Sequence, residues 1–497
     1  MNLARFPINS SNKIIFPRAF AFAVDDLGWN EGGNLTKHSP PGPVRAAVKR
    51  SFDLNDYKHI LTVGKAVGVR VQCLFILSEM DRENILAKYP TTTFQRDKWN
   101  NSRLINDEQL AIMKYVTAEA ANMEFGFHGT GHEHWAEDGI QRRAEWYNLA
   151  DKKPWPEETL RNHIQGFKEI MAQYGLTPEN GHSFPESFVP CAYGYYWNPK
   201  GDYSLGKLLS EVGVKYANTD FGQIPELSPP QEVNGGGFDH GTHVINRLNY
   251  GNHYYNLCTL PVVPLEMQGT DIVETHWPNW LAQDDFLQEE VTKDWINYYR
   301  KVQRIPGRYI AKNTEQLHSQ WLYNKYAVVD EIQTGFVEID NRQMPAEAYR
   351  NDLLGNMVLK IKLNTDQHIS TAGINGNLIP AYFESEGFAF LYLPQLAQQK
   401  YILQYTISSI EMPLHIFNDG TYNVYSLSKE VNTICIELKM YGTQSVKIKC
   451  GNPKAVISLT NGLMINSFKY NETDAVFMLD ISAADIQGTR GKIELKY

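Results

Sequence analysis

The sequence has few cysteines, no excess of basic residues and no long apolar run. Its 497 residues include only five cysteines, which are scattered and form no Cys-x-x-Cys pair, so neither a disulfide framework nor a thiolate metal site is predicted. Lys plus Arg number 47 and Asp plus Glu 56, a formal net charge of −9. This balance argues against nucleic-acid binding. No run of about 18 apolar residues occurs, so no transmembrane helix is expected.

The first 18 residues are polar and are interrupted by Pro7 and Pro17, so they lack the apolar centre of a signal peptide. A cytoplasmic location is therefore the default expectation, and a secreted or periplasmic one would follow if a signal had been trimmed. Hydrophobic residues make up 42% and charged residues 21%, which excludes wholesale disorder. Aromatic residues reach 12%; they are common where sugars stack, but they also fill protein cores.

Up to about residue 325, short apolar runs alternate with longer helix-like stretches. The predicted strands are residues 19–24, 69–77, 123–127, 214–217 and 271–274. The predicted helices are residues 54–66, 107–122, 156–174 and 203–212. Buried strands that alternate with helices favour a parallel sheet, either open or closed into a barrel.

After about residue 330 the sequence becomes strand-like. Short runs rich in β-branched and aromatic residues follow one another, separated by Asn-Gly, Asp-Gly or Gly-Thr turns: residues 357–363, 388–393, 401–407, 433–440, 445–449, 455–459 and 475–479. This pattern predicts an all-β sandwich. We therefore expect an α/β domain over residues 1–328 and a β-sandwich accessory domain over residues 329–497.

Asp25 and Asp26 directly follow the first apolar strand. Two adjacent carboxylates at a buried strand end are costly unless a positive charge, such as a divalent cation, offsets them. In extended backbone the two side chains point to opposite sides, so one can bind metal while the other stays free as a base. The alternative is a plain Asx turn or helix cap.

His128 and His132 follow the strand at residues 123–127 and are separated by Gly129, Thr130 and Gly131. The glycines disfavour a regular helix, since each costs about 1 kcal/mol relative to alanine. They suit a tight loop whose backbone approaches an ion or a substrate closely. Imidazole binds Zn, and also Fe, Co or Ni. The alternative is one surface histidine and one packed histidine.

His276 follows the run at residues 271–274 and precedes Trp277. A lone histidine is usually structural, but beside a sugar-sized pocket it could act as a general acid. Together the three segments present a carboxylate pair, a histidine pair and a single histidine, each at a separate strand end. In an α/β fold, the carboxyl ends of the strands are where catalytic groups gather.

This series resembles the polysaccharide deacetylase family (the NodB-homology domain, carbohydrate esterase family 4). Its first motif, an apolar strand ending in Asp-Asp, is matched by residues 23–26. Its His-x-x-x-His motif is matched by His128 and His132, and its last histidine by His276. The resemblance covers roughly residues 14–325 and implies a distorted (β/α) barrel with about seven strands. The segment at residues 308–321 is similar to the way such domains end.

Residue by residue, the resemblance implies a divalent metal, usually zinc with Co, Ni or Fe as alternatives, held by Asp26, His128 and His132. It implies Asp25 as the catalytic base and His276 as the general acid, with Asp220 as the carboxylate that orients the acid. Residues expected to contact substrate are His134, Trp135, Glu186, Tyr193 and Trp277.

One departure concerns the family's third motif, which places an arginine before a proline turn. The corresponding stretch here, residues 182–187, contains Pro185 but no arginine, and Glu186 stands where a cation is expected. This leaves open an altered substrate, an altered metal site or lost activity. A second histidine cluster, His240, His243 and His253, lies in a Gly-rich stretch that we interpret as a loop, with the substrate groove as the alternative.

The sequence therefore predicts a metal-dependent hydrolase that removes acetyl groups from an N- or O-acetylated carbohydrate. One alternative is a hydrolase on the same scaffold that cleaves another C–N bond or a glycosidic bond. The other is a carbohydrate-binding protein that has lost catalysis. The expected partner is a carbohydrate; neither the oligomeric state nor the task of the β-sandwich is indicated.

Overall fold

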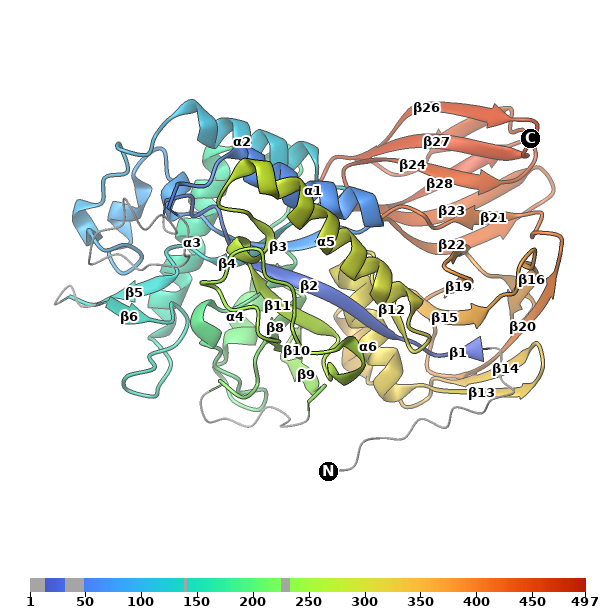
Figure 1. The fold of residues 1–497 in the computed structure, drawn as a ribbon, viewed down its shortest axis with the longest axis horizontal. Coiled ribbons are helices and arrows are strands. Elements are labelled where there is room, and N and C mark those ends of the chain that lie inside the picture. The colour runs from blue at the N-terminus through green and yellow to red at the C-terminus, as the bar shows by residue number, and fades with distance from the viewer. Residues whose placement is uncertain (1–13, 32–48, 138–140, 225–232) are drawn as a thin grey trace.

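The computed structural model describes residues 14–31, 49–137, 141–224 and 233–497 (Figure 1). The blue and green part of the chain forms a barrel, and the orange and red part forms β-sheets beside it. Residues 1–13, where no signal peptide is expected, lie outside the described residues. Within the described ranges, no helix is both long enough and apolar enough to cross a membrane.

Seven parallel strands close the barrel, which confirms the predicted fold class. Each strand pairs with the next and the last pairs with the first, in the order β2 (Arg18–Leu27), β3 (Val71–Ile76), β4 (Met123–Gly129), β7 (Ser187–Phe188), β8 (Tyr216–Thr219), β10 (Thr242–Leu248) and β11 (Ile272–His276). Strand β12 (Arg308–Ile310) extends the sheet beside β2, and β9 (Gly236–Asp239) pairs antiparallel with β10. Because all seven barrel strands run the same way, their carboxyl ends share one rim.

Four helices lie between consecutive barrel strands: α1 (Leu54–Val67), α2 (Asp107–Ala118), α3 (Glu157–Gln173) and α4 (Leu205–Glu211). Helix α5 (Asp285–Arg304) joins β11 to β12, and α6 (Thr314–Tyr326) follows β12. Helix α1 shows why the sequence starts and stops where it does. Asp53 and Asp56 form a capping box at its beginning, and Gly68 ends it in the left-handed conformation at φ 66°. A short hairpin of β5 (Glu133–Trp135) and β6 (Gln141–Arg143) follows β4.

One stretch differs from its sequence interpretation. The Gly-rich segment that we expected to be a loop contains β9 and β10, and β10 is a full member of the barrel. Its sequence, Thr-His-Val-Ile-Asn-Arg-Leu, mixes polar and apolar residues, yet six of its seven residues are buried. The polar side chains are accommodated because they find partners inside the barrel: Arg247 contacts Asp25, and His243 contacts His318.

The C-terminal half forms three sheets that are antiparallel apart from the pair β18–β21. The largest contains β1 (Ile14–Ile15), β15 (Met357–Lys362), β19 (Phe388–Leu393), β18 (Ala381–Ser385), β21 (His415–Phe417), β24 (Thr443–Lys449), β27 (Val476–Ala483) and β26 (Leu463–Asn471). The second sheet contains β13 (Val328–Gln333), β14 (Phe336–Asp340), β20 (Lys400–Ser408), β16 (His368–Ile374) and β17 (Asn377–Leu378). The third contains β22 (Asn423–Lys429), β23 (Thr433–Met440), β28 (Thr489–Lys496) and β25 (Ala455–Ser458). A short helix, α7 (Ala346–Arg350), follows β14.

The barrel and the sheets contact each other through buried polar groups. Arg70, at the amino end of β3, pairs with Glu124 at 2.9 Å and donates to the carbonyl oxygen of Ile486 at 2.9 Å. Strand β1, from the start of the described chain, pairs with β15 of the C-terminal sheet. Hydrogen bonds therefore join segments from the two sides of the predicted boundary at residues 328 and 329. The boundary itself stays a prediction.

Glu186 lies at this same contact, just before β7, and not at the carboxyl rim. Its carboxylate pairs with Lys439 of β23 at 2.6 Å and with Lys215 at 3.3 Å. Burial alone would raise the pKa of the Glu186 carboxyl, but the two ammonium charges outweigh burial and lower this pKa to about 2. The structure thus gives Glu186 a stabilising contact between the two halves in place of the expected substrate contact.

We predict that Glu186→Gln lowers the free energy of unfolding at pH 7 by about 2 kcal/mol. A depressed folded-state pKa contributes stability that is complete above about pH 4.5 and is lost as the pH falls toward 2. Urea unfolding measured between pH 3 and 7 should therefore show a shallower acid dependence for the variant. The exposed Glu472→Gln serves as the matched control. Equal acid dependence in the variant and the wild type would contradict this account.

Candidate metal centre

The histidine loop and the Asp-Asp segment meet at the carboxyl rim of the barrel. The register of β2 against β3 shifts between Val24 and Leu27, and Asp26 adopts a left-handed φ of 73°. His132 also has a left-handed φ, of 67°. Both turns bring their side chains back toward His128 at the end of β4.

Asp26 lies between the two imidazoles. Its Oδ1 is 3.4 Å from His128 Nε2 and 3.6 Å from His132 Nε2. This oxygen is buried and accepts no hydrogen bond from any described residue. Burial alone would raise the pKa of Asp26, but the contact with His128 and the neighbouring imidazoles lower that pKa far below its usual range. The three atoms therefore face a common point with an unfilled acceptor, as ligands of a cation would.

The other nitrogen of each imidazole has its own partner. His128 Nδ1 lies 2.8 Å from the carbonyl oxygen of Val189, and His132 Nδ1 lies 3.0 Å from Glu133 Oε1. Because both partners are acceptors, each Nδ1 is assigned a proton, which leaves Nε2 as the nitrogen that would bind a cation between the ring and Asp26. Carbonyl and carboxylate partners of this kind orient metal-binding histidines and raise their basicity.

Glu145, which the sequence interpretation missed, holds the histidine loop in place. Its carboxylate accepts the backbone N–H groups of Thr130 at 2.9 Å and His132 at 2.7 Å, and contacts His163 Nδ1 at 2.7 Å. The glycines are required here, because a Cβ on Gly129 would lie 2.2 Å from Glu145 Oε2. Glu145 follows no recognisable pattern, so the sequence offered no signal for it.

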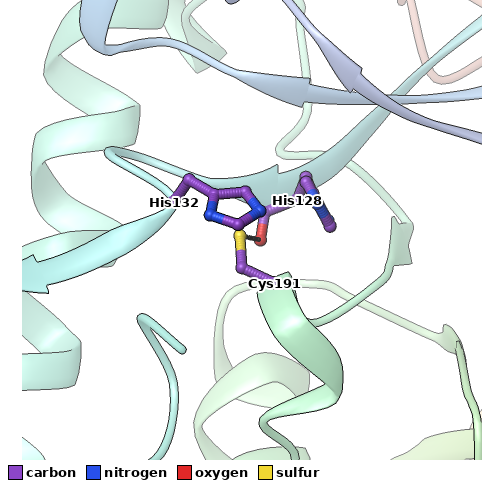
Figure 2. Close-up of side chains that lie close together, drawn as sticks. All are labelled: His128, His132 and Cys191. Carbon is purple, nitrogen blue, oxygen red and sulfur yellow. Dashed lines mark hydrogen bonds between the residues drawn. The ribbon is translucent and has the colours of Figure 1, made fainter. Parts of the chain in front are cut away.

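Cys191 joins the cluster from the segment after β7 (Figure 2). One potential ligand atom each from His128, His132 and Cys191 lies within 4.8 Å of the other two, and all three residues are buried. The Cys191 Sγ also lies 3.3 Å from the carbonyl oxygen of His128. The expectation of no thiolate donor is therefore corrected: spacing of cysteines along the chain could not show that a single cysteine lies beside two histidines.

The donor set fits a divalent transition metal. Zinc binds imidazole nitrogen, carboxylate oxygen and cysteine sulfur, usually with four ligands. Asp26, His128 and His132 provide three such donors, and Cys191 lies near enough to be considered as a further one. Imidazole also binds Co, Ni and Fe, so the donors alone do not select a single metal.

Asp25 points to a different partner, Arg247 of β10. The guanidinium holds both carboxylate oxygens, at 3.0 Å from Nη1 to Oδ1 and 2.6 Å from Nη2 to Oδ2. Its Nε lies 3.6 Å from Glu274 Oε2, and all three side chains are buried. Although burial alone would lower the pKa of Arg247, the two carboxylates raise it, so the arginine stays charged. Arg247 of β10 thus puts a cation beside Asp25, which the stretch at residues 182–187 does not provide.

His276 lies beside the same carboxylates and is 13% exposed, more than its neighbours. Its Nε2 is 4.0 Å from Asp25 Oδ2, and its Nδ1 is 3.9 Å from Glu274 Oε1. The Tyr193 hydroxyl donates to Glu274 Oε1 at 2.6 Å. Asp220 instead accepts the Gly222 N–H at 2.8 Å. Within the described residues, Asp25 and Glu274 are therefore the carboxylates next to His276, and Glu274 takes the place that we expected for Asp220.

The structure brings only some of the expected substrate-binding residues to the site. Tyr193 belongs to the site through Glu274. Trp277 is fully buried against Phe52, at a ring distance of 4.2 Å, so it is a core residue. His134 stacks on Trp155 at 3.6 Å, and Trp135 is 2% exposed; both lie in the hairpin beside the histidine loop with little surface for a sugar.

The second histidine cluster is separate from this site. His243 and His318 share a contact of 3.0 Å between their Nδ1 atoms and are fully buried. His253 is exposed.

The comparison with protein-family models finds no match, and no curated protein matches the chain. The structure thus shows a closed parallel barrel with a buried His-His-Cys cluster at its rim. Asp26 faces both imidazoles of this cluster.

We predict that the purified protein carries about one equivalent of a divalent metal, and that His132→Ala loses most of it, because one of three facing donors is removed. The exposed His253→Ala is the matched control and should keep its metal. Metal content is measured by plasma mass spectrometry after dialysis. Wild-type protein without metal after equilibration with zinc, or His132→Ala with full stoichiometry, would contradict the assignment.

Proposed function

We propose that the protein is a metal-dependent hydrolase that removes acetyl groups from an N- or O-acetylated carbohydrate. The observation that carries the proposal is the convergence of Asp26 Oδ1 with the Nε2 atoms of His128 and His132, beside a separate acid–base pair. Asp26, His128 and His132 would hold the metal, most simply zinc. A divalent cation there would act as a Lewis acid on the acetyl carbonyl and make water a better nucleophile.

Asp25 is suited to accept a proton. It lies beside Asp26 in β2, and its carboxylate is held by Arg247 and lies 4.0 Å from His276 Nε2. The two guanidinium hydrogen bonds fix the plane of the carboxylate. When a water molecule adds to the acetyl carbonyl carbon, Asp25 would take the proton that the water loses.

His276 is suited to return a proton to the leaving group. Its Nδ1 faces Glu274, which is itself held by the Tyr193 hydroxyl and faces Arg247. As the C–N or C–O bond of the acetyl group breaks, a protonated His276 would donate to the departing nitrogen or oxygen. The products are acetate and the free amine or hydroxyl, and the two transfers balance the proton count.

We predict release of acetate from a panel of N-acetylglucosamine oligomers and O-acetylated oligosaccharides, abolished by a chelator and restored by zinc. Asp25→Asn should lower the rate at least about 1000-fold, because the general base is lost, while its metal content stays at the wild-type level. Acetate is measured by an enzyme-coupled assay and metal by mass spectrometry. Metal without acetate release would favour cleavage of another bond, glycan binding without metal would favour a binding protein, and loss of metal in Asp25→Asn would refute the role of Asp25.

We further predict that Arg247→Met lowers kcat by about 10- to 1000-fold without loss of metal, because Asp25 loses the guanidinium that orients it. Arg247→Lys restores the charge but not the two-point contact, so it should recover only part of the activity. The pH–rate profile of each variant is recorded together with kcat. A profile and kcat equal to those of the wild type would show that Arg247 has no positioning role.

A further inference from the structure

A cavity of about 300 Å³ lies at the end of the barrel opposite the metal centre. It is bordered by the end of α1, by α5, by the segment after β12 and by β18 of the C-terminal sheet. Gly68, on its wall, precedes β3, and Ile310 pairs with Phe20 near the start of β2. The cavity therefore opens at the amino ends of the strands, where none of the residues of the proposed reaction lies.

Lys312 is the most unusual residue of this cavity. It is 5% exposed, and its Nζ forms no hydrogen bond or ion pair with any described residue. Its Nζ lies over the face of Phe383, 4.6 Å from the ring centre. A buried ammonium carries three donors and normally finds acceptors for them. Lys312 instead lines open space, which leaves its donors available to a ligand.

The other charges on the wall do not satisfy Lys312. Glu386 is engaged by Arg304 at 2.8 Å, and Asp419 by Lys447 at 2.6 Å. Both of those cations lie outside the lining of the cavity. Each carboxylate is thus already paired with a cation outside the cavity. This pairing reduces the negative charge that the carboxylates present to the cavity.

Two cations are left on the wall without an ion pair among the described residues: Lys312 and Arg300. The third cation of the lining, Lys65, pairs with Glu119 at 2.8 Å. Arg300 comes from α5 and Lys312 from the segment between β12 and α6, so the fold brings the two together from separate elements.

We propose that this cavity binds the oxyanion group, phosphate or carboxylate, of a small organic molecule. Lys312 and Arg300 would hold the oxyanion, since an ammonium and a guanidinium form strong charge-assisted hydrogen bonds with such groups. Phe383 and Ile310 offer an apolar wall to the remainder of the molecule. A volume of about 300 Å³ corresponds to a small ligand.

The end of α1 gives Lys312 a competing explanation. Gly68 caps the helix, and the partial negative charge of a helix C-terminus stabilises a nearby cation. A Cβ on Gly68 would lie 3.5 Å from Lys312 Nζ, so the two are close. If this were the whole role of Lys312, added oxyanions would have no specific effect, which makes the two explanations separable.

The pH dependence adds a second readout. Burial lowers the pKa of Lys312 to about 8, while the charge of Asp419 opposes this shift. The other charged groups facing it are Lys65, Arg300 and Glu386. Because the oxyanion needs the ammonium form, its affinity should fall as the pH rises from 7 to 9. Binding by arginine alone would not show this change.

The test uses the full chain and titrates inorganic phosphate, and separately acetate, by calorimetry at constant ionic strength, with chloride as the reference. We expect saturable binding of phosphate, acetate or both by the wild type, at least about tenfold weaker binding by Lys312→Met, and weaker binding by Arg300→Gln. Lys301→Gln removes the same charge from the exposed face of α5, outside the cavity, and should bind like the wild type. Metal content should be unchanged in all variants.

Stronger binding of phosphate than acetate would identify a phosphate-bearing ligand, and the reverse a carboxylate. Equal heats for phosphate, acetate and chloride in the wild type would overturn the proposal. So would equal affinities of the wild type, Lys312→Met and Arg300→Gln. Arg300 is exposed on α5, so its variant is expected to fold even if Lys312→Met does not. The outcome is independent of acetate release, since the cavity shares no residue with the metal centre.

Discussion

The site depends on one electrostatic constraint: a buried carboxylate oxygen, Asp26 Oδ1, that faces two imidazole nitrogens and accepts no hydrogen bond from the described residues. Leaving such an acceptor unsatisfied away from water is costly, and burying its charge costs more. Closure of seven parallel strands produces the arrangement, because it puts the ends of β2 and β4 on the same rim. A cation between the three groups would satisfy this electrostatic requirement directly.

Asp25 and Asp26 are adjacent in sequence but contact different partners. Asp26 faces the imidazoles, whereas Asp25 is held by both Nη atoms of Arg247. Glu274 lies between Arg247 and His276 and receives the Tyr193 hydroxyl, so a single buried network joins β2, β10 and β11 to the segment after β7. Arg247 is the cation between two carboxylates in this network. The proton acceptor and the proton donor of the proposed reaction are thereby held next to each other, with 4.0 Å between Asp25 Oδ2 and His276 Nε2.

Much of this arrangement could be predicted from local patterns, because the barrel strands β2, β3, β4, β8 and β11 are short apolar runs followed by polar residues. The Asp-Asp pair and the His-x-x-x-His pair could be recognised for the same reason. Strand β10 was missed because its inward polar residues, such as Arg247, look like a loop until their partners are known. Cys191, Glu145 and Glu274 were missed as well, because each acts through a contact between segments distant in sequence.

The positions of Trp277 and Glu186 differ from those expected for substrate contacts, and the physical causes are of the same kind. Trp277 follows the strand end, but a 3-10 turn carries its ring into the core against Phe52. Glu186 precedes β7, whereas a substrate-binding residue at the carboxyl rim would follow it, and Glu186 contacts Lys439 at the other end of the barrel. A sequence pattern shows which residues adjoin a strand, but only the strand bounds show at which end they lie.

The central claim is most directly tested by anomalous diffraction from crystals grown with zinc, recorded on both sides of the zinc absorption edge. The account predicts one strong peak within bonding distance of Asp26, His128 and His132, and the same map shows whether Cys191 Sγ is a fourth ligand. A peak elsewhere, for example between His243 and His318, or the absence of any peak at the rim of the barrel, would contradict the account.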